Sequence, residues 1–466
     1  MDSAHRIQRI AQTLDSMDPT IPPSYNSPAR SGELPVYTQR ASGVQPRRVL
    51  TEHHYHLTSR GSKPPWATLT VFSRSPTPSQ LPTFLEGDKI TGTFTVDLES
   101  AENITCVRAV AKGQIIPGPA DKEAFTFVEV ASTLWSKEND PRNARLSGHY
   151  QWPFSLEMPI TVTIPATKYF PSETFRLPQT FLERRVSTSI QYVFVVHIDR
   201  GRFRVNSRLQ TQFAYVPATQ PPSPPSPLRQ LAYQQNSPLP GPELDPDGWA
   251  QSPPFVVRGT VFSTRQVEAV CTLSLAKPLS YTRGSPIPCA LTLSSTDEQA
   301  LDLLSSPRAI SVHLRRRLKP IVPASKRNGI FDANADLSAD PAENLAAASW
   351  WPSLGGDEDA PGSGPLRNIS TRRLDGEIQL APTLKPSSRI AHFAVEYSVE
   401  VLPFKAIAFT PAHGEPLLKQ SVEVVTMFAS NSPRPRTYAP PQYNVVQEEA
   451  RDTYFNADGL HHVWRT

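Results

Sequence analysis

Three short proline–tyrosine motifs near the ends of the chain carry the clearest chemical signal in the sequence. Two have the spacing Pro-Pro-x-Tyr and the third is the related Leu-Pro-x-Tyr; their defining residues are Pro22, Pro23 and Tyr25, then Pro440, Pro441 and Tyr443, and Leu34, Pro35 and Tyr37. Adjacent prolines preset a polyproline II turn whose rings fit between the aromatic side chains of a WW domain. The tyrosine returns to the same face and fills a second groove. The motifs therefore predict WW-domain binding at both ends of the chain.

The alternative interpretation is a tyrosine that falls by chance beside proline-rich linker sequence. The chain has 50 prolines and 13 tyrosines in 466 residues, and composition alone predicts roughly 0.15 Pro-Pro-x-Tyr motifs in such a chain. Because the prolines cluster, the number of motifs expected by chance is several-fold higher than this. Leu-Pro-x-Tyr is a weaker signal than Pro-Pro-x-Tyr. Motifs at both ends would also allow bivalent capture of a partner with several WW domains, which gains about 10²-fold in avidity.

Two other segments have residue types suited to binding. Arg315, Arg316 and Arg317 follow a strand-like run that starts at Ile310, and they could contact anionic lipid or an acidic cargo tail. A solvated strand face is the alternative. The segment PPSPPSP at 221–227 could bind an SH3 domain through its PxxP spacing, or it could be a plain spacer.

The sequence shows no pattern for catalysis or metal binding. GxSxG, HExxH, P-loop and GxGxxG motifs are all missing. His53, His54 and His56 lie close together but without an accompanying set of carboxylates or cysteines. The net charge of +4 is too small and too dispersed to indicate nucleic acid. We expect a protein that is not an enzyme, with no cofactor, no metal and no small-molecule substrate.

The stretch 177–217 predicts the central hairpin of an all-β domain. Ile190, Tyr192, Phe194 and Val196 fall on alternate positions, which is typical of a strand with one face in a core. Arg200 and Gly201 then predict a turn. Together with Ile198, these side chains would contribute on the order of 10 kcal/mol of gross burial.

Similar strand patterns precede this hairpin and recur in the second half of the chain. LEGDKITGTFTVDL at 85–98 aligns with YTRGSPIPCALTL at 281–293, and IQYVFVV at 190–196 aligns with VEYSVEV at 395–401. The two offsets, 197 and 205, nearly agree. The repetition predicts two tandem β-sandwiches of similar plan.

Proline-rich and aperiodic stretches predict the boundaries of these domains. The expected organisation is a disordered tail at 1–64, a first sandwich at 65–217, a linker at 218–254, a second sandwich at 255–430 with a disordered insertion at 320–368, and a second tail at 431–466.

The distribution of apolar residues and the three cysteines predict a soluble protein of the cytoplasm. No run approaches eighteen apolar residues, and the first residues lack the apolar core of a secretory signal. We expect Cys106, Cys271 and Cys289 to be reduced residues of the core.

The strand segments resemble the arrestin family, specifically its α-arrestin branch of trafficking adaptors. The segments that carry the resemblance are LEGDKITGTFTVDL at 85–98, QWPFSLEMP at 151–159, LPQTFLE at 177–183 with SIQYVFVVHI after it, and PLSYTRGSPIPCALTL at 278–293. The linker and the insertion are long for that family, and the buried charged core of visual arrestins finds no clear match.

The resemblance implies a fold, partners and a location. The fold would be two immunoglobulin-like sandwiches, and the partners would be a WW-domain HECT-type ubiquitin ligase and a membrane transporter or receptor as cargo. The protein would then be recruited peripherally to the plasma membrane or endosomes and promote ubiquitylation and endocytosis. The alternative is an arrestin-fold scaffold for vesicle sorting or signalling that binds SH3 or WW partners without a ubiquitin role.

Overall fold

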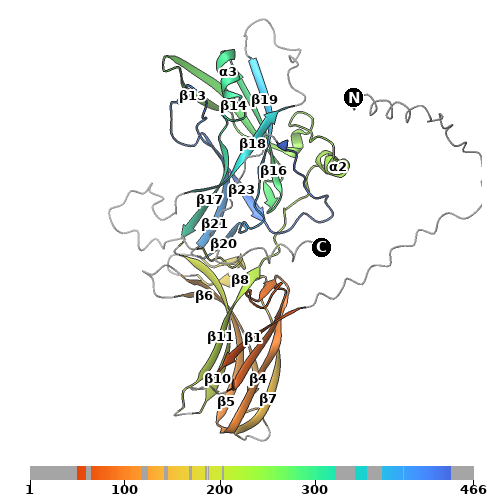
Figure 1. Cartoon of the computed structure of the whole chain (residues 1–466), viewed down its shortest axis with the longest axis vertical. Helices are drawn as coiled ribbons and strands as arrows, with labels where there is room; N and C mark the ends of the chain where they lie inside the picture. Colours follow the sequence, from red (N-terminus) through yellow and green to blue (C-terminus); the bar gives the residue numbers. More distant parts are fainter. Residues whose placement is uncertain are drawn as a thin grey trace, which may run out of the picture. The chain divides into compact units, whose positions relative to one another are not determined.

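Within the described residues, the regular secondary structure is almost entirely β-strand (Figure 1). Its helices within the described residues are α2 (Pro227–Gln235), α3 (Glu298–Leu304) and the 3-10 turn η1 (Pro246–Gly248). The prediction of an all-β chain is confirmed. The computed structural model describes residues 50–58, 64–116, 124–140, 145–166, 171–183, 186, 188–201, 204–320, 342–353, 370–391 and 393–441.

The first β-sandwich has two main sheets. One has the strand order β1-β2-β4-β7, the other has the order β3-β11-β10-β5-β6, and β8 pairs with β9 in a separate hairpin. The strands are β1 (Thr51–Leu57), β2 (Ala67–Ser73), β3 (Thr83–Leu85), β4 (Lys89–Glu102), β5 (Ile104–Ile116), β6 (Phe125–Ser136), β7 (Leu146–Glu157), β8 (Thr161–Ile164), β9 (Glu173–Arg176), β10 (Ser189–Arg200) and β11 (Ser207–Val216).

The predicted central hairpin is β10–β11, and it lies inside its sheet as expected. β10 is hydrogen-bonded to β11 on one side and to β5 on the other. Tyr192, Val196 and Ile198 are completely buried. Phe194 stacks on Phe154 of β7, with ring centroids 5.0 Å apart. The two sheets therefore share one core, as the alternating pattern predicted.

The second β-sandwich is a continuous path of strands that folds back on itself. The order is β15-β23-β21-β17-β18-β19-β16-β14-β13-β22, with β12 on β14 and β20 on β21. The strands are β12 (Trp249–Gln251), β13 (Phe255–Val261), β14 (Arg265–Ala276), β15 (Ser280–Thr282), β16 (Pro286–Ser295), β17 (Val312–Pro320), β18 (Glu343–Pro352), β19 (Ser370–Gln379), β20 (Ser388–Ile390), β21 (Phe393–Val401), β22 (Phe409–Pro411) and β23 (Leu418–Val425).

A glycine turn followed by a long strand recurs in both sandwiches. Gly87 has φ +83° and Gly284 has φ +79°, a backbone conformation that favours glycine. The short strand before each glycine pairs in parallel with a later strand, β3 with β11 and β15 with β23. The alignment of 85–98 with 281–293 thus corresponds to equivalent positions in three dimensions.

The two aligned tyrosines also make equivalent hydrogen bonds. Tyr192 of β10 donates its hydroxyl to the carbonyl of Pro178 at 2.7 Å. Tyr397 of β21 donates its hydroxyl to the carbonyl of Lys385 at 2.6 Å. In each sandwich the tyrosine thus bonds to a non-strand segment that precedes it in the chain, between β9 and β10 in the first and between β19 and β20 in the second.

Three of the expected disordered or linker segments contain ordered elements. Within 1–64, the residues of β1 pair along their whole length with β2, so the prediction of a loose tail up to residue 64 is wrong for 51–57. His53 is 2% exposed and contacts Ser73 Oγ through Nε2 at 2.9 Å. This strand was not recognised in the sequence because polar threonine and histidine pairs across β1 and β2 obscure the alternation of apolar and polar residues.

The linker 218–254 contains α2, a helix that was not predicted because the segment is rich in proline. Ser226 caps the helix by accepting a hydrogen bond from the Arg229 backbone, and proline occupies its first turn. Arg229 is 1% exposed; it donates to the carbonyls of Lys277 and Gly248 at 2.9 and 2.8 Å and lies over the Trp249 ring. The linker is therefore packed against the second sandwich.

The insertion 320–368 contains β18, which joins the two sheets of the second sandwich. Its first part pairs with β17 and its last part with β19. Ala346, Ala348 and Trp350 are buried on alternate positions, so a period of two was present in the sequence. It was missed because alanine has low strand propensity. The prediction of a wholly disordered insertion is wrong here.

Candidate functional site

The described residues include part of only one proline–tyrosine motif. Pro440 is partly buried and Pro441 is exposed, and both follow a segment that packs on the second sandwich. Tyr443 and all motif residues before position 50 lie outside the described residues. WW-domain binding at these positions stays a prediction.

The run Arg315–Arg317 lies on β17, an interior strand between β21 and β18. The side chains alternate across the sheet, so Arg315 and Arg317 share one face. Arg315 Nη1 lies 2.6 Å from Glu400 Oε2, and Arg317 Nη2 lies 3.6 Å from Glu400 Oε1. Burial raises the pKa of Glu400, but hydrogen bonds from Ser398 and Arg315 outweigh it and leave that pKa below its usual value. On this face of the sheet, two arginines therefore neutralise one buried carboxylate.

Arg316 points to the opposite face and connects the two sandwiches. It is 7% exposed and binds both carboxylate oxygens of Glu183, at 2.8 and 2.7 Å. Glu343 of β18 accepts a further hydrogen bond at 2.7 Å. Burial lowers the pKa of Arg316, and the bonds to Glu183 more than reverse this. Contact of this run with lipid or cargo stays a prediction, and its observed contacts are internal ion pairs.

More cations are buried close to this ion pair than sequence reasoning expected. Arg283 donates to Gln179 Oε1 at 3.1 Å, and burial lowers its pKa to about 10. Lys385 is 6% exposed, and burial together with the charge of Arg283 lowers its pKa to about 8. Phe181 and Phe393 meet here with ring centroids 5.2 Å apart. The junction of the sandwiches is therefore an apolar contact with embedded charges.

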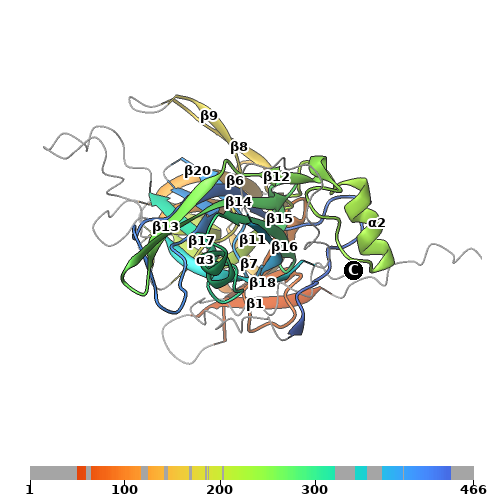
Figure 2. The same ribbon diagram turned by 90° about the horizontal axis from the view of Figure 1, so that it is seen from above.

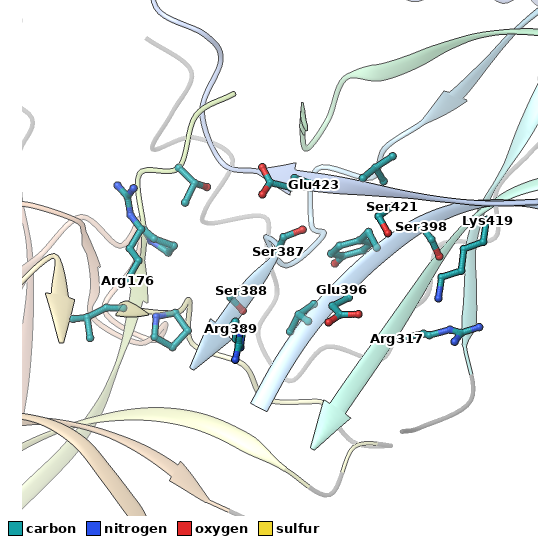
Figure 3. A pocket seen from close by; sticks show the side chains of 17 residues that line it. Arg176, Arg317, Ser387, Ser388, Arg389, Glu396, Ser398, Lys419, Ser421 and Glu423 are labelled. Carbon is teal, nitrogen blue, oxygen red and sulfur yellow. The ribbon is translucent and has the colours of Figure 1, made fainter. Parts of the chain in front are cut away.

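A cleft of about 480 Å³ opens beside this junction (Figure 3). The first sandwich contributes the end of β9 and the residues after β9 and β11, and the second contributes residues of β17, β20, β21 and β23. Figure 3 shows side chains from the β20, β21 and β23 ribbons on one side and Arg176 on the other. Four serines line the cleft: Ser387, Ser388, Ser398 and Ser421.

The charges of the cleft are mixed, with cations in excess. Its basic residues are Arg176, Arg317, Arg389 and Lys419, and its acidic residues are Glu396 and Glu423. Arg176 binds Glu86 at 2.8 Å, and Arg389 lies 3.4 Å from Glu173. Because much of this charge is already paired at the rim, the cleft is suited to a polar peptide segment held by hydrogen bonds.

Apart from Arg316, which was singled out for a different role, sequence reasoning did not identify the residues of this junction. The signal for Glu400 was present, because a carboxylate within the apolar run VEYSVEV needs a cation when the strand is buried. Arg283, Lys385 and Glu183 gave no comparable local signal, since only the folded chain brings them together.

The described residues contain no group of three or more histidine, cysteine, aspartate or glutamate side chains that could hold a metal ion. Cys271 and Cys289 are buried free thiols, while Cys106 is only partly buried.

Within the described part of the chain, no helix has the length and apolar character that crossing a membrane requires. No protein-family model matches the chain, and a search of curated proteins finds no significantly similar sequence.

Proposed function

We propose that this protein is an arrestin-like adaptor that links membrane cargo to a WW-domain HECT-type ubiquitin ligase. The cargo would be a transporter or receptor, and its ubiquitylation and endocytosis would follow. The adaptor would be recruited peripherally to the plasma membrane or endosomes through its cargo, and it would carry out no catalysis of its own.

The observation that carries the proposal is that both Pro-Pro-x-Tyr motifs lie, in sequence, outside the segments that form the strands of the two sandwiches. One motif lies within the first 49 residues, before β1, and the other starts at Pro440, after β23. A motif outside the sheets can adopt the polyproline II conformation without breaking a strand ladder. Recruitment and cargo binding can therefore be separate functions of the chain.

The repeated structural features support an arrestin-like tandem of immunoglobulin-like sandwiches. The glycine turns at Gly87 and Gly284 and the equivalent bonds of Tyr192 and Tyr397 indicate one plan used twice. In such a tandem, the cleft beside the junction is our candidate surface for a polar cytosolic segment of the cargo.

No specific observation favours the alternative of an SH3-binding scaffold. The segment 221–227 leads directly into α2, and Ser226 caps that helix. Pro221 and Pro225 contribute to a small cavity against the second sandwich. These contacts favour a structural role for the connector.

The test is capture of the full-length chain by isolated WW domains of a HECT-type ligase. Replacing Tyr25→Ala and Tyr443→Ala together should remove most of the capture, because the tyrosine fills the second groove of the domain. Adding Tyr37→Ala should remove what the weaker Leu-Pro-x-Tyr motif retains. Tyr454→Ala is the matched control, since Tyr454 lies in the same C-terminal region without the motif. Unchanged capture of the double variant would refute the proposal.

A further inference from the structure

The segment just before the second Pro-Pro-x-Tyr motif is attached to the second sandwich. We call residues 436–439 the strap. Arg436 Nη1 donates to Asn236 Oδ1 at 3.0 Å, at the C-terminal cap of α2. Tyr438 stacks on Tyr233 of α2, with ring centroids 6.4 Å apart, and its hydroxyl reaches the carbonyl of Ala232 at 3.4 Å. The blue C-terminal segment passes close to α2 in Figure 2.

Glu377 of β19 fixes the strap from the other side. Its Oε2 accepts a hydrogen bond from the Tyr438 backbone N–H at 2.9 Å, and the carboxylate also accepts from the Ala439 N–H. Glu377 is 5% exposed, and the structure gives it no ion pair with any described residue. A buried carboxylate without a cation is costly unless hydrogen bonds satisfy it. The strap supplies those hydrogen bonds.

The strap ends at Ala439, directly before the first proline of the motif. Ala439 is 9% exposed, and the adjacent Pro440 is partly buried. A WW domain encloses the proline rings of its ligand in an aromatic groove. It cannot surround Pro440 while the residue before it lies against the sandwich, so binding requires the strap to detach.

We propose that the strap is an autoinhibitory contact that competes with WW domains for the second Pro-Pro-x-Tyr motif. This inference rests on the proposed WW-binding function and adds its regulation. The attached state keeps Pro440 against the second sandwich, and the detached state frees it for a WW domain. The apparent affinity for a WW domain is then reduced by the fraction of molecules in the detached state.

The experiment compares one isolated WW domain binding to the chain and to a peptide of residues 434–447. The chain carries Tyr25→Ala and Tyr37→Ala, so that only the second motif remains. We expect the chain to bind about tenfold more weakly than the peptide. Glu377→Ala in the chain should recover most of this difference, because it removes the acceptor for the strap amides without changing the motif.

Glu268→Ala is the matched control, since Glu268 is an exposed strand glutamate paired with Arg258 far from the strap in sequence. It should leave WW affinity unchanged. Tyr438→Ala provides a second test that does not depend on the folding of the Glu377 variant. It should strengthen binding to the chain but not to the peptide.

Hydrogen exchange gives an independent readout of detachment. The amides of Tyr438 and Ala439 should be protected in the free chain and lose protection when the WW domain is added. Equal affinity of chain and peptide, with no effect of Glu377→Ala, would overturn the strap while leaving the proposed function intact. A peptide that does not bind any WW domain would overturn WW binding at the second motif, and the strap with it.

Discussion

At the scale of single residues, a few polar groups decide where loops and sheets meet. Tyr192 and Tyr397 are both buried, and each donates its hydroxyl to a backbone carbonyl of a non-strand segment. The pKa of each phenol is raised by burial, so both stay protonated donors near neutral pH. The hydrogen bond, rather than the ring alone, specifies tyrosine at these positions.

Replacing either tyrosine by phenylalanine should therefore destabilise the chain. The substitution keeps the ring but leaves a buried carbonyl without its donor, which costs about 1–3 kcal/mol. The measurement is the free energy of unfolding in urea. Tyr150→Phe on β7, where the ring is only partly buried, is the control and should change it by less than about 0.5 kcal/mol. Equal effects at all three positions would contradict this assignment.

Gly376 is required by the packing of Trp350. A Cβ at position 376 would lie 2.5 Å from Trp350 Cε3, closer than side-chain contacts allow. Gly376→Ala should destabilise the second sandwich by about 1–3 kcal/mol. Combining it with Trp350→Leu, which removes the clashing ring, should give a smaller penalty than the sum of the two single changes in a double-mutant cycle. Simple additivity would count against this contact.

At the scale of elements, local patterns predicted most strands, and tertiary context decided the others. The strong alternation in 85–98 and 190–198 gave β4 and β10 directly. α2 was missed because its stabilising partners lie far away in the sequence. Arg229 bonds to carbonyls at 248 and 277, and such pairings leave no periodic trace in one segment. β18 was missed because alanine has low strand propensity, although its buried residues alternate.

The anchoring of α2 by Arg229 can be tested directly. Arg229→Met should cost about 2–3 kcal/mol and make residues 227–235 more sensitive to proteolysis, because two hydrogen bonds and the stacking on Trp249 are lost. Arg258→Met is the control, since the Arg258–Glu268 ion pair is exposed and should contribute little. Unchanged proteolysis of the helix in the Arg229 variant would show that other contacts hold it.

At the scale of the whole molecule, buried cations at the junction couple the stability of the fold to pH. Lys385 is surrounded by Arg283, Arg316 and Glu183, and burial lowers its pKa from 10.5 to about 8. Between these two values the unfolded chain keeps a proton on Lys385 that the folded chain has released. The contribution of Lys385 to stability should therefore rise with pH across this window and be lowest below pH 8.

This contribution should accordingly increase from pH 8 to about pH 9.5. The buried thiols of Cys271 and Cys289 act in the opposite direction over the same range, because burial raises the pKa of each and they ionise only in the unfolded chain. Lys385→Met should therefore be more stable than the wild-type chain at pH 7, and this difference should shrink as the pH rises, because the wild-type chain then loses its buried charge. Lys419→Met in the neighbouring cleft is the control and should show no such trend. The measurement is urea unfolding of each chain at closely spaced pH values, and a difference between the wild-type chain and the Lys385 variant that does not change with pH would contradict the role of this group.

The division between folded sandwiches and terminal motifs is the central claim at this scale. The most direct measurement is proximity labelling in cells with the full-length chain and with its Tyr25→Ala, Tyr443→Ala variant. The wild-type chain should label both a WW-domain HECT-type ligase and a membrane transporter or receptor, while the variant should lose the ligase and keep the membrane protein. Labelling of the ligase at an unchanged level in the variant would contradict the account.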